Sequence, residues 1–254
     1  MKRSTKWSAV MLAAMLPLAA QAGELAVSGD AGVVSQYLWR GVPQTACTAA
    51  QGDLKIAGNG LTGAAWYSNA YASPAPQKAG RSVVEFDWSL DYSGSVGDVG
   101  YSAGGILYSY LNDSASNFGE IYLGASYAAA VTPGVKLYYN VASSKNKAYL
   151  AGDVWVDLSL AGSVADFAVA GTLSLTNWKK DATNRPVVGG VDKFKSGLSL
   201  GTLAVSRTVS LEKVNLTPSF TFSQPVGSKA SDGERYLYGV PVKSEVVVGM
   251  NLAY

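Results

Sequence analysis

The chain has 254 residues, only 15% of them charged, with a single cysteine, Cys47, and no histidine. The lack of histidine excludes Ser-His-Asp triads and histidine zinc sites, and one cysteine forms neither an intramolecular disulfide nor a cysteine metal cluster. Twenty basic residues nearly balance eighteen acidic ones, so net charge does not favour nucleic acid as a partner. We predict no cofactor and no metal site.

The first residues of the chain have the features of a secretory signal peptide. Three cations precede an apolar run at 7–20, and a small-x-small cleavage site ends at Ala22. The apolar run is too short to span a bilayer as a helix. We therefore predict that residues 1–22 are removed after Ala22 and that residues 23–254 form the mature protein.

The rest of the chain repeats one pattern, in which apolar and polar side chains alternate over about ten residues before turn residues follow. In the segment 83–92, Phe86 and Trp88 alternate with Glu85 and Asp87. A period of two indicates a strand with one apolar face, whereas a helix needs a period near 3.6. The pattern predicts strands at 24–40, 50–57, 61–71, 83–92, 100–110, 118–128, 135–141, 154–160, 167–175, 193–209, 214–222 and 245–254.

Two of these segments are irregular. The apolar phase slips within 193–209, and a bulge near Gly201 would keep that segment as one strand. Pro218 lies inside the segment 214–222, where it cannot donate a ladder hydrogen bond. With the bulge, the strands number about twelve, an even number that is typical of single-chain bacterial barrels.

The connections between the predicted strands alternate between short and long, as in outer-membrane barrels with short periplasmic turns and long external loops. We predict an all-β fold: a transmembrane antiparallel up-and-down β-barrel of about 12 strands, with both termini in the periplasm. The last strand ends on the aromatic residue Tyr254. That ending resembles the sorting signal of bacterial outer-membrane barrels, which implies the barrel-assembly machinery as a partner.

Charged residues fall mainly on the polar face of the strands, which faces the lumen of a barrel. Carboxylates outnumber cations there, so we expect water in the lumen and a mild preference for cations or neutral polar solutes. The alternative is a closed interior in which Arg40 and Lys55 neutralise neighbouring carboxylates. The candidate lumen-lining residues are Arg40, Asp53, Lys55, Glu85, Asp87, Asp91, Glu120, Asp153 and Asp157.

The predicted external loops carry more basic than acidic residues. This excess suggests contact with the phosphates of lipopolysaccharide, although ordinary solvated loop charge explains it equally well. Tryptophans such as Trp39, Trp88 and Trp178 are candidates for the aromatic girdles at the membrane interfaces. Trp66 and Trp155 fall on the inward face, where they would narrow the lumen.

The segment 35–45, Ser-Gln-Tyr-Leu-Trp-Arg-Gly-Val-Pro-Gln-Thr, resembles the opening of the TorF-type porins, also called the Gcw_chp family. Those proteobacterial proteins combine a signal peptide, a similar first strand and a terminal aromatic residue. The resemblance implies a barrel in the cell outer membrane of a Gram-negative bacterium, with pore activity. It implies no particular solute.

Three hypotheses of function follow from the sequence. The first is a porin-like channel for passive diffusion of small polar solutes across the outer membrane. The second is a structural or adhesive barrel with a plugged lumen. The third is an enzyme that uses a carboxylate pair such as Glu85 with Asp87, an arrangement found in glycosidases. Strand alternation alone produces such pairs, and no nucleophile with a base accompanies them, so we predict no enzymatic activity.

Overall fold

The computed structural model describes residues 25–70, 83–180, 183, 185 and 190–254. The predicted signal peptide lies outside the described residues. Within the described part of the chain, the only helical element is one 3-10 turn, η1 (Ser114–Ser116), and no helix is long and apolar enough to cross a membrane.

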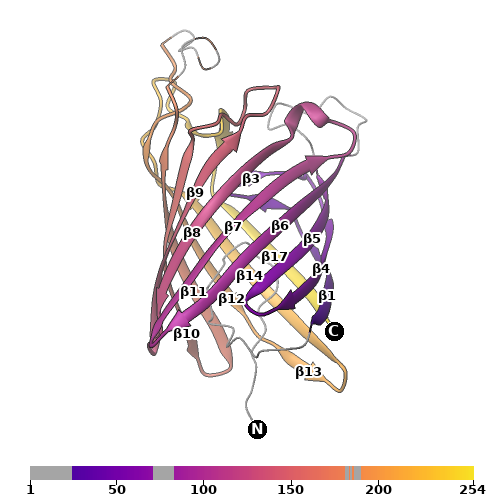
Figure 1. Cartoon of the computed structure of the whole chain (residues 1–254). Coiled ribbons are helices and arrows are strands. Elements are labelled where there is room, and N and C mark those ends of the chain that lie inside the picture. The colour runs from indigo at the N-terminus through magenta and orange to yellow at the C-terminus, as the bar shows by residue number, and fades with distance from the viewer. Residues whose placement is uncertain (1–24, 71–82, 181–182, 184, 186–189) are drawn as a thin grey trace.

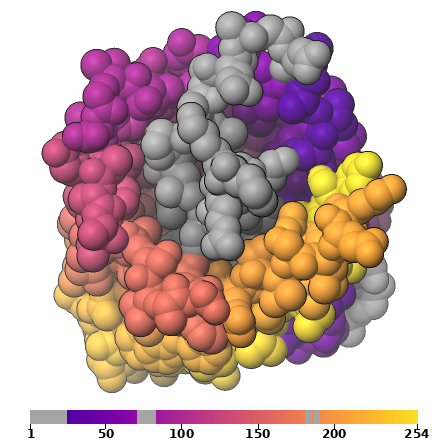
Figure 2. Space-filling model, turned by 90° about the horizontal axis from the view of Figure 1, so that it is seen from below, coloured from indigo at the N-terminus to yellow at the C-terminus, as the bar shows by residue number. Residues whose placement is uncertain are grey.

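Twelve antiparallel strands form a closed β-barrel (Figure 1), which confirms the predicted fold class. Each strand pairs with its neighbours in the sequence, and β1 pairs with β17 to close the ring. Seen from below, the chain runs round the ring in order, so that its first and last strands lie side by side (Figure 2). The strands are β1 (Ala26–Val34), β4 (Ala49–Gly58), β5 (Leu61–Ala70), β6 (Val83–Val96), β7 (Val99–Tyr110), β8 (Phe118–Tyr127), β9 (Val131–Ala142), β10 (Val154–Val164), β11 (Phe167–Asn177), β12 (Gly197–Ser206), β14 (Val214–Pro225) and β17 (Glu245–Ala253).

The two ends of the barrel differ in the length of their connections. At the end where β17 finishes, turns of two or three residues such as 59–60, 97–98 and 128–130 join successive strands; Asn59 and Gly60 have φ of 50° and 81°. Positive φ at both positions is the type I′ geometry that suits tight hairpins. We call this the short-turn end. The opposite, long-loop end carries connections such as 35–48, 143–153, 178–196 and 226–244.

The turns after β8 and β10 lie away from the positions that the sequence predicted. They fall at 128–130 and 165–166, whereas the alternation predicted turns near 132–134 and 161–163. Near these turns the chain is rich in small residues, for which the apolar alternation gives a weak signal. The strands therefore continue further than their large side chains indicate.

The alternation along each strand separates the two faces of the wall. In β6, the outward Trp88 and Leu90 are 53% and 61% exposed, whereas the inward Glu85 and Asp87 are buried. Large apolar side chains cover the outside of the barrel in the same way on the other strands. An apolar surface of this extent is unfavourable in water and suits a lipid environment.

The predicted first strand, 24–40, is shorter in the structure. β1 ends at Val34, and the chain then folds inward as a small hairpin, β2 (Leu38–Trp39) and β3 (Val42–Pro43). The Tyr37 N–H donates to Thr45 Oγ1 at 2.8 Å, and the Gln44 N–H donates to the Tyr37 carbonyl at 2.7 Å. These bonds fix the base of the hairpin.

The two irregular strands are accommodated in different ways. In β12, Ser174 pairs with Leu200 and Leu175 pairs with Leu198, so Ser199 is an extra residue at the position of a bulge. The chain therefore passes Gly201 as a strand with a bulge two residues from the predicted position, and no turn forms there. The predicted segment 193–209 is not one strand throughout: β12 ends at Ser206, and a separate short strand, β13 (Val209–Leu211), pairs with β14. Pro218 faces outward from β14, and its carbonyl accepts a hydrogen bond from the Arg207 N–H at 3.2 Å.

Candidate functional site

The inward hairpin of β2 and β3 turns on Arg40 and Gly41, which have φ of 46° and 78°. This is again a two-residue turn with positive φ at both positions. A Cβ on Gly41 would lie 2.7 Å from Leu200 Cδ1 and 3.0 Å from Leu237 Cδ1. The hairpin tip therefore packs closely against Leu200 of β12 and against Leu237, and it fits there only with glycine at position 41.

Arg40 fastens the hairpin tip to the barrel wall. Its Nη1 and Nη2 donate to the two carboxylate oxygens of Glu120 on β8, at 2.7 and 2.8 Å. Both side chains are more than nine-tenths buried. The guanidinium carbon also lies 4.5 Å from the ring centroid of Tyr138 and 5.0 Å from that of Trp155. A bidentate, buried pair of this kind holds one geometry strongly.

A second hairpin enters the barrel from the connection between β14 and β17. It consists of β15 (Arg235–Leu237) and β16 (Val240–Val242), and it turns on Tyr238 and Gly239 with φ of 52° and 79°. The Tyr238 hydroxyl accepts a hydrogen bond from Arg40 Nη1 at 2.8 Å. Two hairpins with the same turn geometry thus meet inside the barrel.

Aromatic rings from the wall and the loops fill the space around the two hairpin tips. Trp39 lies at the centre, with its ring 4.8 Å from that of Tyr238 and 5.6 Å from that of Tyr149. The Phe118 and Tyr149 rings stack at 3.9 Å. All of these side chains are buried, so they close the long-loop half of the lumen. The buried aromatic members of this cluster are Tyr37, Trp39, Tyr108, Tyr110, Phe118, Tyr149, Trp155, Trp178 and Tyr238.

The observed positions of the tryptophans differ in part from the predicted aromatic girdle. Trp88 faces outward, but Trp39 and Trp178 are buried inside the barrel, at 3% exposure each. Trp39 belongs to the inward hairpin, and Trp178 follows the end of β11, so neither continues the outward face of a strand. Trp66 and Trp155 lie inside, on the face that their strand phases indicate.

A second buried ion pair holds the loops at the long-loop end. Arg185 donates from Nη1 and Nη2 to the two carboxylate oxygens of Asp153, both at 2.6 Å. Its guanidinium carbon lies 4.1 Å from the ring centroid of Phe194. Hydrogen bonds from the Phe194 N–H and from Lys180 lower the pKa of the half-buried Asp192 carboxyl below its ordinary value. The connection between β11 and β12 is therefore held by the ion pair with Asp153 and by hydrogen bonds among its own residues.

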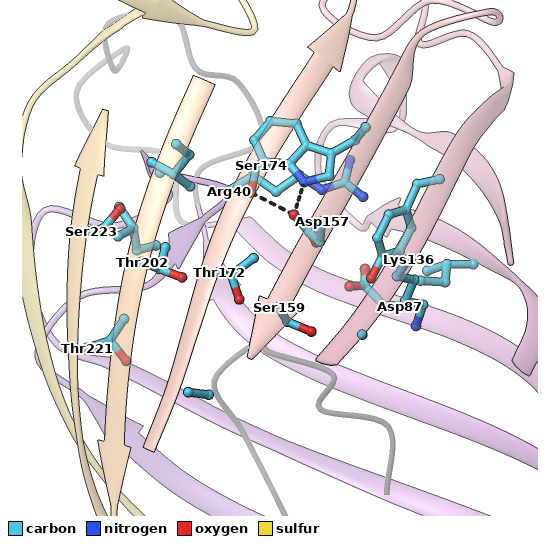
Figure 3. Close-up of a pocket in the computed structure, with 18 of the residues that line it drawn as sticks. Arg40, Asp87, Lys136, Asp157, Ser159, Thr172, Ser174, Thr202, Thr221 and Ser223 are labelled. Carbon is cyan, nitrogen blue, oxygen red and sulfur yellow. Dashed lines mark hydrogen bonds between the residues drawn. The ribbon is translucent and has the colours of Figure 1, made fainter. Parts of the chain in front are cut away.

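Beneath the hairpin tip, the barrel encloses a cavity of about 470 Å³. Tyr37, Arg40 and Gly41 form part of its roof, and its lining reaches Thr132 and Ala161 near the short-turn end. Figure 3 shows how side chains from several strands converge on this space. The volume is within the range of about 300–1,000 Å³ that small-molecule pockets occupy. We therefore take this cavity as the candidate functional site.

Two carboxylates and one lysine form an ion cluster in the wall of the cavity. Lys55 Nζ contacts the Asp53 carboxylate directly and lies 3.9 Å from Asp30 Oδ2. Asp30 and Asp53 stand opposite each other on β1 and β4. A single cation thus lies between two carboxylates that would otherwise repel each other.

The remaining charged groups of the cavity are also partly compensated. Lys136 Nζ lies 3.8 Å from the ring centroid of Tyr122. Asp157 accepts hydrogen bonds from Trp155 Nε1 at 2.7 Å and from the Ser174 hydroxyl at 2.6 Å. In all, three cations and three carboxylates line the cavity: Arg40, Lys55, Lys136, Asp53, Asp87 and Asp157. Glu85, Glu120 and Asp153 lie outside this cavity, so its lining is less acidic than the set of candidate lumen residues as a whole. The mild preference for cations stays a prediction.

The other candidate residues from the sequence occupy three different places. Glu120 forms an ion pair with Arg40, and Asp153 forms one with Arg185, both above the cavity. Glu85 is buried and accepts a hydrogen bond from the Tyr110 hydroxyl at 2.9 Å, and Asp91 accepts one from the Tyr122 hydroxyl at 2.6 Å. Tyr254 is 81% exposed, and its N–H donates to the Gly29 carbonyl at 3.1 Å. Its role as a sorting signal stays a prediction.

Sequence reasoning missed the two loop residues that complete the closure, Tyr238 and Arg185. The pattern Tyr-Leu-Tyr-Gly-Val-Pro-Val around Tyr238 carries a hairpin signal, because a Gly stands between two short runs that favour strands. Arg185 lies in a long connection without any periodic pattern, so no sequence signal points to its partner. Among the described residues, no group of three or more acidic, cysteine or histidine side chains is placed to hold a metal ion.

Comparisons with known proteins support the fold. No family model matches the chain, and no curated protein sequence matches it. Among solved structures, the NanC porin aligns with a TM-score of 0.50 at 10% identity, over 90% of this chain and 99% of its own. LpxR from Salmonella typhimurium aligns with a TM-score of 0.48 at 8% identity, over 89% and 99%. The alignment with the NanC porin supports the barrel fold, and the TorF-type resemblance stays a prediction.

Proposed function

We propose that the protein is an outer-membrane channel for small polar solutes, closed in the conformation described here by the inward hairpin of β2 and β3. The observation that carries the proposal is a cavity of about 470 Å³ directly beneath the Arg40 hairpin tip, lined by charged and hydroxyl groups as well as apolar side chains. We place the short-turn end in the periplasm, so that solutes reach the cavity from that side while the aromatic cluster closes the outer side.

The contacts of the hairpin of β2 and β3 are of a kind that would allow it to move and open the lumen. Its tip is held by side chains, through Arg40 with Glu120 and Tyr238, and not by the strand ladder of the wall. The barrel therefore stays closed as a ring when the hairpin moves. Opening requires that the Arg40–Glu120 pair separates and that the Trp39 ring leaves its aromatic neighbours.

A permanently plugged, structural barrel is the second candidate. The extensive burial of Trp39, Phe118 and Tyr149 favours it, because such rings are costly to expose. We keep the interpretation that the protein is not an enzyme. The carboxylates Glu120 and Asp153 each accept two hydrogen bonds from an arginine, which is a structural use of both groups.

Planar-bilayer conductance of the refolded protein distinguishes a channel from a plug. We expect rare, brief openings of the wild-type protein and an open probability at least about tenfold higher in Arg40→Ala, because a change of about 1.4 kcal/mol already shifts a two-state equilibrium tenfold. Arg207→Ala is the matched control, since its pair with Asp166 is exposed at the short-turn end. Correctly folded proteins that stay silent in all three forms would contradict the channel and favour the plug.

A further inference from the structure

A row of hydroxyl groups crosses one side of the cavity. Ser159 on β10 stands opposite Thr172 on β11, Thr172 stands opposite Thr202 on β12, and Thr202 stands opposite Ser223 on β14. All four side chains point to the inside of the barrel and line the cavity (Figure 3). Four neighbouring strands therefore present hydroxyls at directly paired positions.

Three hydroxyls of this row have no hydrogen-bond partner in the protein. They belong to Thr172, Thr202 and Ser223, and Thr221, one pleat further along β14, is in the same condition. Thr172, Thr221 and Ser223 are at least nine-tenths buried. Buried hydroxyls without partners are costly, and native proteins usually satisfy them with water or a ligand. These hydroxyls can therefore donate hydrogen bonds to a polar molecule and accept hydrogen bonds from it.

The rest of the lining fits a solute without net charge. Three cations and three carboxylates line the cavity; Lys55 pairs with Asp53, and Arg40 pairs with Glu120, which lies outside the lining. Once Arg40 is counted with Glu120, the lining carries an excess of only one negative charge, which gives an ionic solute little to bind. Two half-buried rings, Trp66 and Tyr138, also line the cavity and offer apolar faces beside the polar groups.

We propose that the cavity binds a neutral, polyhydroxylated solute of the size of a mono- or disaccharide. Solute hydroxyls pair with Thr172, Thr202 and Ser223, while the C–H face of the solute packs on an aromatic ring. The inference rests on the proposed function in taking the cavity as part of the solute path. Binding itself needs no conduction, and the two are measured separately.

The test uses glucose and maltose as probes for the full-length mature protein, folded in a detergent without a sugar headgroup. Saturable binding is measured by calorimetry and by the tryptophan fluorescence change, with gluconate and glucosamine as charged comparisons of similar size. We expect saturable binding of at least one neutral sugar and weaker binding of both charged probes. Equal or tighter binding of the charged probes would overturn the proposal that the bound solute is neutral.

The variant Thr172→Val/Thr202→Val/Ser223→Ala removes the three unpartnered hydroxyls while keeping the side-chain shapes nearly unchanged. We expect sugar binding to weaken by about tenfold or more, because each lost hydrogen bond reduces affinity several-fold. Folding should be preserved, since these hydroxyls make no bond within the protein. Thr217→Val is the matched control: it lies on the same face of β14, outside the cavity, and its hydroxyl already contacts Thr208 at 3.0 Å.

Sugar binding that is unchanged in the triple variant, or no saturable binding to the folded wild-type protein, would overturn the inference. These results are independent of the conductance test. Sugar binding without conduction in any variant would contradict the proposed channel and leave the binding site supported. Conduction without sugar binding would leave the channel supported and contradict the binding site.

Discussion

Arg40 shows at the scale of a residue how this barrel is closed. Its backbone has a φ of 46°, a left-handed conformation that costs a non-glycine residue about 1–2 kcal/mol. The contacts of its side chain offset that cost. The guanidinium makes two hydrogen bonds to Glu120 and one to Tyr238, and it lies against aromatic rings. The strand alternation predicts that Arg40 faces the lumen, but no sequence pattern identifies Glu120, which is 80 residues away, as its partner.

The Arg40–Glu120 pair leads to the first prediction on stability. Glu120→Met should reduce the free energy of unfolding by about 3–5 kcal/mol, because it leaves a buried guanidinium without its carboxylate. The double variant Arg40→Met/Glu120→Met should recover most of that loss, since an apolar pair of similar volume needs no compensation. Urea unfolding in lipid vesicles measures both. A loss below about 1 kcal/mol in Glu120→Met, the range of exposed pairs, would contradict a dry, buried closure.

At the scale of the element, strands with large alternating side chains could be predicted and the inward hairpin could not. In β6 the period of two fixes which residues face lipid. After β1 the same alternation continues through Tyr37 and Trp39, although the chain has already left the wall. The turn at Arg40-Gly41 lacks the Asn-Gly or Asp-Gly pair that marks most tight hairpins. The burial of these rings depends on distant aromatic partners, which no local pattern encodes.

The face assignment of β6 leads to a prediction with an internal control. Leu90, which is 61% exposed on the outside, lies near the middle of the strand, and its neighbour Ser89 lines the cavity. Leu90→Arg should lower the free energy of unfolding by about 2–4 kcal/mol, because it places a charge near the bilayer midplane. Ser89→Arg should fold with a smaller loss, since its charge enters a cavity lined by carboxylates such as Asp87 and Asp157. Heat-modifiable mobility and urea unfolding report the result; reversed sensitivities would mean that the strand register is wrong.

At the scale of the whole molecule, the closed ring and its filled interior have different origins. The ring follows from twelve amphipathic strands, because a barrel satisfies every strand edge in an apolar medium. The closure at the long-loop end depends on contacts between segments far apart in the sequence, such as Arg40 with Tyr238 and Arg185 with Asp153. The first could therefore be predicted from alternation, whereas the second depends on tertiary contacts that no local sequence pattern contains.

One measurement tests the central claim that the lumen is closed at the long-loop end and accessible from the short-turn end. Cys47, the only cysteine, is exposed beside the inward hairpin and reports on the long-loop end. A second protein, Cys47→Ser/Ser159→Cys, places a single thiol in the cavity. Both are treated in cells with a maleimide on a polymer too large to cross the outer membrane.

We expect Cys47 to react in intact cells, and the cavity thiol to react only after the outer membrane is permeabilised. Reaction of the cavity thiol in intact cells at the rate of Cys47 would contradict the account, because it would mean that the lumen is open through the long-loop end. Failure of the cavity thiol to react in permeabilised cells, while it reacts in the unfolded protein, would equally contradict access from the short-turn end.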